Sequence, residues 1–407
     1  MHPRDNPYTP NAGAMPLALT GRDNLISDFE VLLHRLGQGL SGQSMIITGL
    51  RGVGKTVLLN RFRDIAEANE WQVIEIEATN NSSDSEFRSV FAREMVDVLT
   101  CLEPRRKRWS DRFLHAFLAV RSLSVSIDPS GSVSTSLGFS DDDTSPEGPL
   151  ALDLTKAFQR LGQAAHEKGT GVVVLVDEIQ FLTSGQLEGL IRALHKTVQR
   201  SLPMTLVGAG LPQIAELAGD AKSYAERLFI FPSIGNLSDQ QAREALCHPA
   251  EKHNVVYEDA AVEVAMQHTG GYPYFIQEFG YTAWNQSVGP TITPGDVANA
   301  AADYQNKLDS SFFRVRYDRT TDLERSYLRA MADGGPGPQK TSDIASRMDR
   351  SVTELASTRR RLIDNGMIYS PAYGTAAFTV PHFDRYMRRI MPDIAEPERR
   401  GRHRLND

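Results

Sequence analysis

The stretch Gly49-Leu50-Arg51-Gly52-Val53-Gly54-Lys55-Thr56 fits the pattern G-x-x-x-x-G-K-[ST] at every constrained position. The apolar run Met45–Ile47 precedes it and an apolar-periodic run from Val57 follows, so the local order is strand, loop, helix. The glycines let the backbone wrap around a phosphate chain, and the helix N-terminus directs partial positive charge at the anion. Lys55 is expected to reach the β- and γ-phosphates, and the Thr56 hydroxyl to face Mg²⁺. The residues from Gly49 to Val57 are therefore predicted to bind a nucleoside triphosphate, taken as ATP.

A pair of carboxylates ends the aliphatic strand predicted over 172–176. Asp177 and Glu178 follow it directly, which is the Walker B arrangement when it occurs beside a phosphate-binding loop. Asp177 is expected to hold Mg²⁺ through water, and Glu178 to polarise the water that attacks the γ-phosphate. Glu178 and Lys55 are the catalytic candidates, and Thr56 and Asp177 the metal-binding ones. A strand that ends in Asp-Glu by chance is the plainer alternative.

Length and composition indicate a multidomain globular protein. The chain has 407 residues, of which 41% are hydrophobic and 23% charged, so two or three domains are expected. The longest aliphatic run is too short to span a bilayer, and the first residues carry no apolar signal segment. Two cysteines fit a reducing compartment. We expect a cytoplasmic protein without a membrane partner.

The net charge of −7 is unevenly distributed. From Ser310 onward there are 18 Lys and Arg against 13 Asp and Glu, so the remainder of the chain is acidic. A basic C-terminal part favours nucleic-acid contact at that end, although a purely solvated basic surface gives the same count.

Hydrophobic periodicity divides the chain into five segments. Residues 1–14 are rich in Pro, Asn and Gly and are predicted to be disordered, and 15–235 alternate strands and helices. Within the second segment, 103–150 is interpreted as an insertion with a β-hairpin. Past Pro232 the strand patterns stop, and 236–309 is predicted to be a small all-α domain. The last two segments are 310–395 and a basic tail, 396–407.

The order of elements predicted over 310–395 is helix, helix, helix, hairpin, which is that of a winged helix-turn-helix. In its third helix, predicted over 352–364, one stripe is expected to face the core: Val352, Leu355, Ala356, Leu362 and Ile363. The opposite face is expected to contact double-stranded DNA through Thr353, Ser357, Arg360 and Arg361. The alternative is a solvated face on a module that docks onto protein.

These motifs together resemble the AAA+ and STAND-type ATPases, particularly the branch with origin-recognition initiators and archaeal-type ATPases. The resemblance covers about 17–305 and is carried by Gly49–Thr56, Asp177–Gln180, Gly208–Pro212, Thr20–Asp23 and Gly270–Pro273. It implies an α/β fold with an ASCE-type parallel-sheet core, a helical lid, and nucleotide between them. Several such families also carry a C-terminal winged helix.

The resemblance further implies roles for single residues. Arg22 is expected near the adenine, Tyr272 and Pro273 against the nucleoside, and Arg227 as a trans-acting arginine finger. Each has a structural alternative: a charge at a helix start, a helix-breaking turn, and a surface ion pair. The strand tip Gly208–Gly210 lacks the polar γ-phosphate sensor of such families, and no arginine beside 270–277 is assignable as a second sensor.

Two functions remain open at this stage. The first is a slow ATP-hydrolysing switch that binds DNA through its winged helix and changes its oligomeric state or its grip on DNA. The second is a STAND-type signalling or scaffold ATPase in which the winged helix contacts protein or holds the chain inactive. A metabolic enzyme is disfavoured because no second catalytic constellation is visible.

Overall fold

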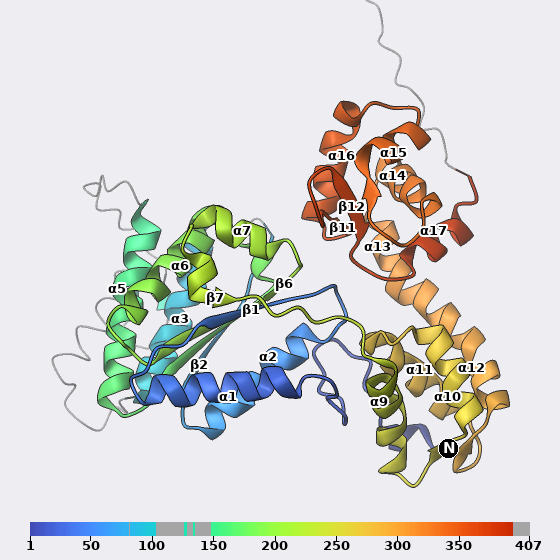
Figure 1. Ribbon diagram of the computed structural model, residues 1–407, viewed down its shortest axis with the longest axis horizontal. Coiled ribbons are helices and arrows are strands. Elements are labelled where there is room, and N and C mark those ends of the chain that lie inside the picture. The colour runs from blue at the N-terminus through green and yellow to red at the C-terminus, as the bar shows by residue number, and fades with distance from the viewer. Residues whose placement is uncertain (81, 103–125, 128–132, 135–147, 394–407) are drawn as a thin grey trace, which may run out of the picture.

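The computed structural model describes residues 1–80, 82–102, 126–127, 133–134 and 148–393. A five-stranded, entirely parallel sheet in the order β2-β5-β6-β1-β7 forms the core of the N-terminal part (Figure 1). Its strands are β1 (Ser44–Thr48), β2 (Gln72–Glu77), β5 (Val172–Asp177), β6 (Met204–Gly210) and β7 (Phe229–Ile230). The parallel α/β core predicted from the sequence is confirmed. Because the strands run the same way, the loops after β1, β5 and β6 meet at one edge of the sheet.

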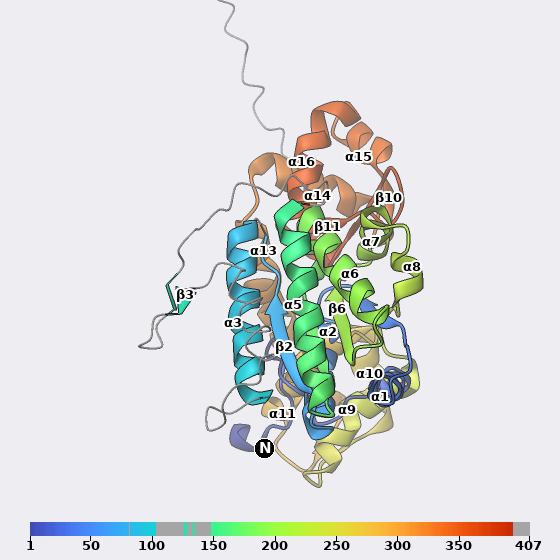
Figure 2. The same cartoon turned by 90° about the vertical axis from the view of Figure 1, so that its left-hand side faces the viewer.

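Helices cover both faces of this sheet (Figure 2). One face packs against α1 (Asp23–Gly37) and α2 (Lys55–Ala68), and the other against α3 (Asp84–Leu102), α5 (Gly148–Glu167), α6 (Ser184–Val198) and α7 (Ile214–Ala221). Successive strand residues alternate between the two cores: Ile47 faces α2, whereas Ile46 faces the other side. The short α8 (Ala225–Leu228) leads into β7. In the described part of the chain, no helix is long and apolar enough to cross a membrane.

A bundle of four helices follows the core. It comprises α9 (Asp239–Glu251), α10 (Asp259–Thr269), α11 (Pro273–Gln286) and α12 (Pro294–Lys307). Capping boxes at Ser238 and Thr293 fix two of the starts, since each side chain accepts from a backbone N–H three residues on. The prediction that strands stop after Pro232 is wrong in one detail. The two-residue strands β8 (Val256–Tyr257) and β9 (Thr291–Ile292) pair in parallel within the bundle.

Residues 1–14 lie against this bundle, which corrects the prediction that they are disordered. Tyr8 is only 2% exposed and belongs to the core, and Asn6 donates to the Tyr281 carbonyl at 3.0 Å and to the Asn285 side chain at 2.9 Å. The amino group of Met1 donates to the Ser287 carbonyl. One buried aromatic and a few hydrogen bonds therefore outweigh a composition that favours disorder.

The C-terminal module, defined here as residues 310–393, joins the bundle through one continuous helical path. Helix α12 runs into the π-helical turn Leu308–Phe313 and then into α13 (Arg314–Asp318). After α13 the module packs four helices beside a small antiparallel sheet in the order β10-β12-β11. Its elements are α14 (Asp322–Asp333), β10 (Gln339–Lys340), α15 (Thr341–Arg347), α16 (Val352–Asp364), β11 (Ile368–Tyr369), β12 (Thr375–Phe378) and α17 (Phe383–Ile390).

Two segments predicted from the sequence fall largely outside the described residues. In the interpreted insertion, 103–150, only β3 (Ser126–Ile127), β4 (Val133–Ser134) and the start of α5 are described, and β3 and β4 pair antiparallel. The basic tail, 396–407, lies wholly outside them.

Candidate nucleotide site

A cavity of about 440 Å³ opens at the carboxyl edge of the sheet. Most of its lining comes from the segment Thr9 to Thr20, the loop after β1 with the start of α2, the start of α11, and the helical path into the C-terminal module, and Arg22, Glu178, Leu237 and Ala245 complete it. The volume lies in the range of small-molecule sites. Ten residues predicted from the sequence to form the site line this cavity: Arg22, residues 51–57, Glu178 and Pro273.

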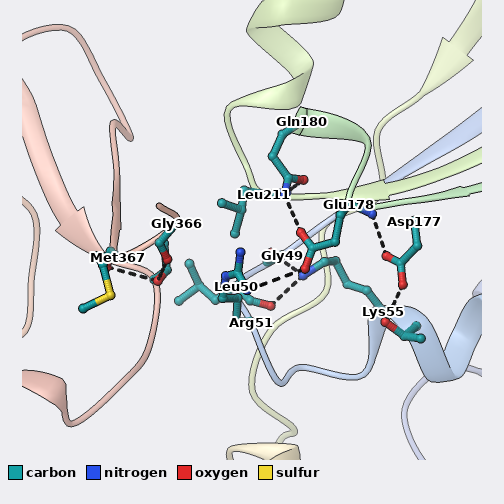
Figure 3. A network of polar contacts seen from close by, with 12 residues as sticks. Gly49, Leu50, Arg51, Lys55, Asp177, Glu178, Gln180, Leu211, Gly366 and Met367 are labelled. Carbon is teal, nitrogen blue, oxygen red and sulfur yellow. Dashed lines mark hydrogen bonds and ion pairs between the residues drawn. The ribbon is translucent and has the colours of Figure 1, made fainter. Parts of the chain in front are cut away.

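The loop of residues 49–54 has the backbone that its sequence predicts. Gly52 and Gly54 have φ angles of +80° and +93°, a region that residues with a side chain rarely adopt. Helix α2 begins directly after Gly54, at Lys55. Gly49 and Leu50 do not line the cavity; their carbonyls instead accept hydrogen bonds from Lys55 Nζ at 3.0 and 2.9 Å (Figure 3).

Lys55 is buried, with 6% of its surface exposed. Burial lowers the pKa of its ammonium group, and the nearby carboxylates Glu178 and Asp177 act in the opposite direction. A buried cation held only by two carbonyl oxygens is an incompletely compensated charge. An incoming phosphate would supply the missing negative charge.

Thr56 and Asp177 meet beside Lys55, where a magnesium ion is expected. The Thr56 hydroxyl donates to Asp177 Oδ2 at 2.6 Å. A hydroxyl and a carboxylate oxygen fit Mg²⁺, which binds to one or two carboxylates and completes its shell with substrate phosphates and water. No cluster of three or more His, Cys, Asp or Glu side chains suited to a metal occurs among the described residues, so this pair is their Mg²⁺ candidate.

Glu178 adopts a backbone that is costly for a residue with a side chain. Its φ is +49° and its ψ +37°, in the left-handed region. Such strain is concentrated at functional sites, where the surrounding structure holds it. Here the Glu178 backbone N–H donates to Asp177 Oδ1 at 2.8 Å, and the side chain accepts a hydrogen bond from Gln180 and lies 3.8 Å from Arg51 Nη1. The carboxylate is thus held toward the loop (Figure 3).

Gln180 explains why Gly210 ends β6. Its amide oxygen accepts from the Leu211 N–H at 3.0 Å while its amide nitrogen donates to Glu178. A Cβ on Gly210 would lie 2.7 Å from that amide oxygen, so a side chain there would displace Gln180. Sequence reasoning did not assign Gln180 a role, although the glycine pair at a strand tip signals a close neighbour.

Of the residues expected around the nucleoside, Arg22 and Pro273 line the cavity, whereas Tyr272 does not. Arg22 is 7% exposed and donates to the carbonyls of Gly21, Val53 and Gly235 at 3.0 to 3.1 Å, so it braces the loop backbone. Tyr272 is buried against Gly52, and its hydroxyl has no hydrogen-bond partner within the described residues. Burial raises the pKa of this phenol, so it stays protonated and able to donate.

Arg227 is not brought to the cavity. It lies on α8 with an exposed side chain, and its backbone carbonyl accepts from Gln43 at 3.1 Å. Arg227 therefore does not line the nucleotide cavity of its own chain, and the predicted action in trans and the alternative of a surface residue both stay open.

All four residues expected to contact DNA are exposed on α16: Thr353, Ser357, Arg360 and Arg361. The two arginines have partners, because Arg360 pairs with Asp364 at 3.1 Å and Arg361 with the buried Glu324 at 3.0 Å. The stripe predicted to face the core is partly wrong. Val352 and Ala356 are exposed, and Thr358 is buried instead.

The C-terminal module touches the phosphate-binding loop itself. The Arg51 N–H donates to the Thr379 carbonyl at 3.3 Å, and the turn at Gly366 lies against the Arg51 guanidinium (Figure 3). The side chain of Asn80, after β2, donates to the Asp364 carbonyl at 3.0 Å. The end of α16 is therefore docked on the core beside the nucleotide cavity.

Family comparison assigns the core. Residues 18–207 match the family described as AAA ATPase domain. This part of the chain is similar to that family, and it has the fold of a P-loop ATPase. Residues 310–387 match a family described as a domain of unknown function, DUF8462, which coincides with the C-terminal module. No match was found among curated proteins.

Several solved structures resemble the whole chain. The Walker-type ATPase PABY2304 of Pyrococcus abyssi is 18% identical with a TM-score of 0.53, over 91% of this chain and 96% of that one. The ORC2 protein of Aeropyrum pernix is 15% identical with a TM-score of 0.49, over 94% and 98%. The RuvB branch migration motor of Thermotoga maritima is 15% identical with a TM-score of 0.44, over 88% and 92%. The likeness to the Pyrococcus ATPase supports the P-loop ATPase fold.

Proposed function

We propose that this protein is a slow, ATP-hydrolysing molecular switch of AAA+/STAND type whose C-terminal module is a winged helix that binds double-stranded DNA. The observation that carries the proposal is the docking of this module on the phosphate-binding loop through Arg51 and Thr379. Because the module contacts the loop, a change in the phosphates bound there can alter the position of the module. Such coupling is what a two-state switch requires.

The proposed chemistry uses the residues gathered at the cavity. Lys55 and the loop amides bind the phosphates, Thr56 and Asp177 hold Mg²⁺, and Mg²⁺ offsets the phosphate charge. Glu178 orients water for attack on the γ-phosphate. Slow turnover is consistent with the contacts of Glu178, because Gln180 and Arg51 occupy its carboxylate and compete with water for it.

DNA binding is proposed for the exposed face of α16. This helix follows α15 after a short turn and precedes the β11–β12 hairpin, whose tip carries the fully exposed Tyr373. In a winged helix this arrangement presents one helix to the major groove and the hairpin to the backbone. The exposed Thr353, Ser357 and Arg360 are the side chains available for contact.

Replacing Ser357 and Arg360 together is expected to weaken DNA binding. The variant Ser357→Glu/Arg360→Ala removes one positive charge and adds one negative charge on the exposed face. We expect duplex affinity to fall about tenfold and its salt dependence to become shallower, because fewer counterions are released. Fluorescence anisotropy with a labelled duplex across a salt series measures both. Arg361 is left intact because its removal would leave the buried Glu324 unpaired.

The matched control is Arg243→Ala, which removes an arginine that is likewise ion-paired to a carboxylate, Glu263, but lies on α9. Its duplex affinity should equal that of the wild type. A wild type without duplex affinity at low salt would contradict DNA binding.

One observation favours a second function. Arg360 and Arg361 are both ion-paired within the chain, and the end of α16 is docked on the core. These contacts support a STAND-type ATPase in which the C-terminal module holds the chain inactive or contacts a protein partner. If the chain does not bind duplex DNA but self-associates on addition of ATP, as measured by light scattering, this second function is favoured over the first. Arg227 is the residue proposed to act across the interface between the associated chains.

A further inference from the structure

Arg316 reaches the nucleotide cavity from outside both the ATPase core and the helical bundle. It lies on α13, in the path that joins α12 to the C-terminal module, and it lines the cavity together with Arg51, Lys55 and Glu178. Its side chain is half-buried. A cation from the C-terminal module thus faces the same space as the phosphate-binding loop.

This arginine has donors to spare. It donates one hydrogen bond, to the Phe312 carbonyl, and its guanidinium lies 4.1 Å above the Phe312 ring. No ion pair links it to a carboxylate among the described residues, whereas Arg22, which also lines the cavity, uses its donors on three carbonyls. A guanidinium carries five N–H donors, so most of those on Arg316 await an acceptor.

Positive charge is in excess around it. Burial lowers the pKa of Arg316 to about 10, and the like charge of Arg51 adds to the effect. Arg51 Nε is itself buried without a hydrogen-bond partner in the described residues. Two neighbouring, partly desolvated guanidinium groups are costly unless an anion lies between them. The geometry therefore calls for a polyanion such as a nucleotide phosphate chain.

The local sequence fixes where Arg316 points. Phe312, one turn earlier, stacks on Tyr274 of the bundle with ring centres 4.6 Å apart. Its neighbour Phe313 is fully buried and stacks on Tyr386 of the module at 5.2 Å. These two aromatics come from a π-helical turn, a distortion that is frequent at functional sites. Arg316 is thus anchored to the bundle on one side and to the module on the other.

We propose that Arg316, together with Arg51, binds the terminal phosphate of ATP, and that this contact couples nucleotide occupancy to the position of the C-terminal module. The inference rests on the ATP binding proposed above for the same cavity. Coupling is reciprocal. If ATP binding favours the module position in which Arg316 contacts the phosphate, then holding the module in that position raises the ATP affinity by the same factor by which ATP favours it. Arg316 contributes less to the affinity for ADP, because ADP lacks the terminal phosphate.

The test compares nucleotide affinities of the full chain by isothermal titration with ATP or ADP in the presence of Mg²⁺. Arg316→Ala is expected to weaken ATP binding about 10- to 100-fold and ADP binding less than about threefold, as one or two charge-assisted hydrogen bonds predict. Arg314→Ala is the matched control, because it lies on the same helix but is exposed and paired with Asp318. Its affinities should stay at wild-type values. Arg316→Lys keeps the charge without the planar fork, and an intermediate loss of ATP affinity is expected.

Hydrogen exchange of peptides spanning α13 and α14 supplies the readout for coupling. ATP should protect these peptides in the wild type and in Arg314→Ala but not in Arg316→Ala. Suppose that the wild type binds ATP. If Arg316→Ala and Arg316→Lys then show the same ratio of ATP to ADP affinity as the wild type, this inference is overturned and the proposed function is not. A wild type that binds neither nucleotide would overturn the proposed function and this inference with it.

Discussion

Lys55→Ala is expected to lower ATP affinity by at least about 100-fold and to abolish measurable turnover. The ammonium group is buried, and within the described part of the chain it donates to the carbonyls of Gly49 and Leu50 alone. Its removal deletes the one buried ammonium at the start of α2, and each charge-assisted hydrogen bond to phosphate contributes about 1.5–3 kcal/mol. Titration calorimetry and phosphate release measure the two effects.

Two comparisons make this prediction specific. Lys252→Ala removes an exposed lysine just after α9, far from the cavity, and should bind ATP as the wild type does. Thermal unfolding without nucleotide should show that Lys55→Ala remains folded, since loss of a partly compensated buried charge does not weaken the core. ATP binding by Lys55→Ala at wild-type affinity would remove the loop from the mechanism.

Glu178→Gln is expected to keep ATP binding and to lower turnover by about two to four orders of magnitude. Glutamine has the same shape and its amide oxygen still accepts from Gln180, so the held conformation of the loop after β5 is retained. The substitution removes the negative charge that polarises water. A positioned acid–base group in an enzyme contributes about two to four orders of magnitude to the rate. The loss of a negative charge beside the phosphates should leave ATP affinity equal or increased.

The control for charge alone is Glu75→Gln, on the edge strand β2, where the carboxylate pairs with the surface residue Arg63. Its turnover should not change. Unaltered turnover in Glu178→Gln would assign water activation to another group, and lost ATP binding would make Glu178 a structural residue.

The parts of the site predicted from the sequence are those determined within one local unit. Gly49–Thr56 and Asp177–Glu178 each sit at the junction of a strand with its following loop, and period-two and helical patterns identify such junctions. The parallel sheet follows from the alternation of those units. The exposed face of α16 could also be predicted from local sequence, because the adjacent charges of Arg360 and Arg361 indicate a solvent-facing surface.

The parts that were not predicted depend on contacts between distant segments. Nothing in the spacing of the chain relates Arg316 or Thr379 to Arg51, because their proximity arises from the docking of one module on another. The disorder predicted for 1–14 failed for the same reason, since the burial of Tyr8 depends on the bundle. At the end of α12 the sequence did offer one signal, two aromatics followed by arginines at Phe312–Arg316.

The central proposal is that the nucleotide in the cavity controls the position of the C-terminal module and therefore its affinity for DNA. The direct measurement is the affinity of the wild-type chain for one labelled duplex at fixed salt and Mg²⁺, with ATP, with ADP and without nucleotide. The account predicts that ATP and ADP give affinities at least about tenfold apart, which corresponds to about 1.4 kcal/mol of coupling, and that Lys55→Ala removes the difference. Equal duplex affinity under all three conditions, with ATP bound, would contradict it.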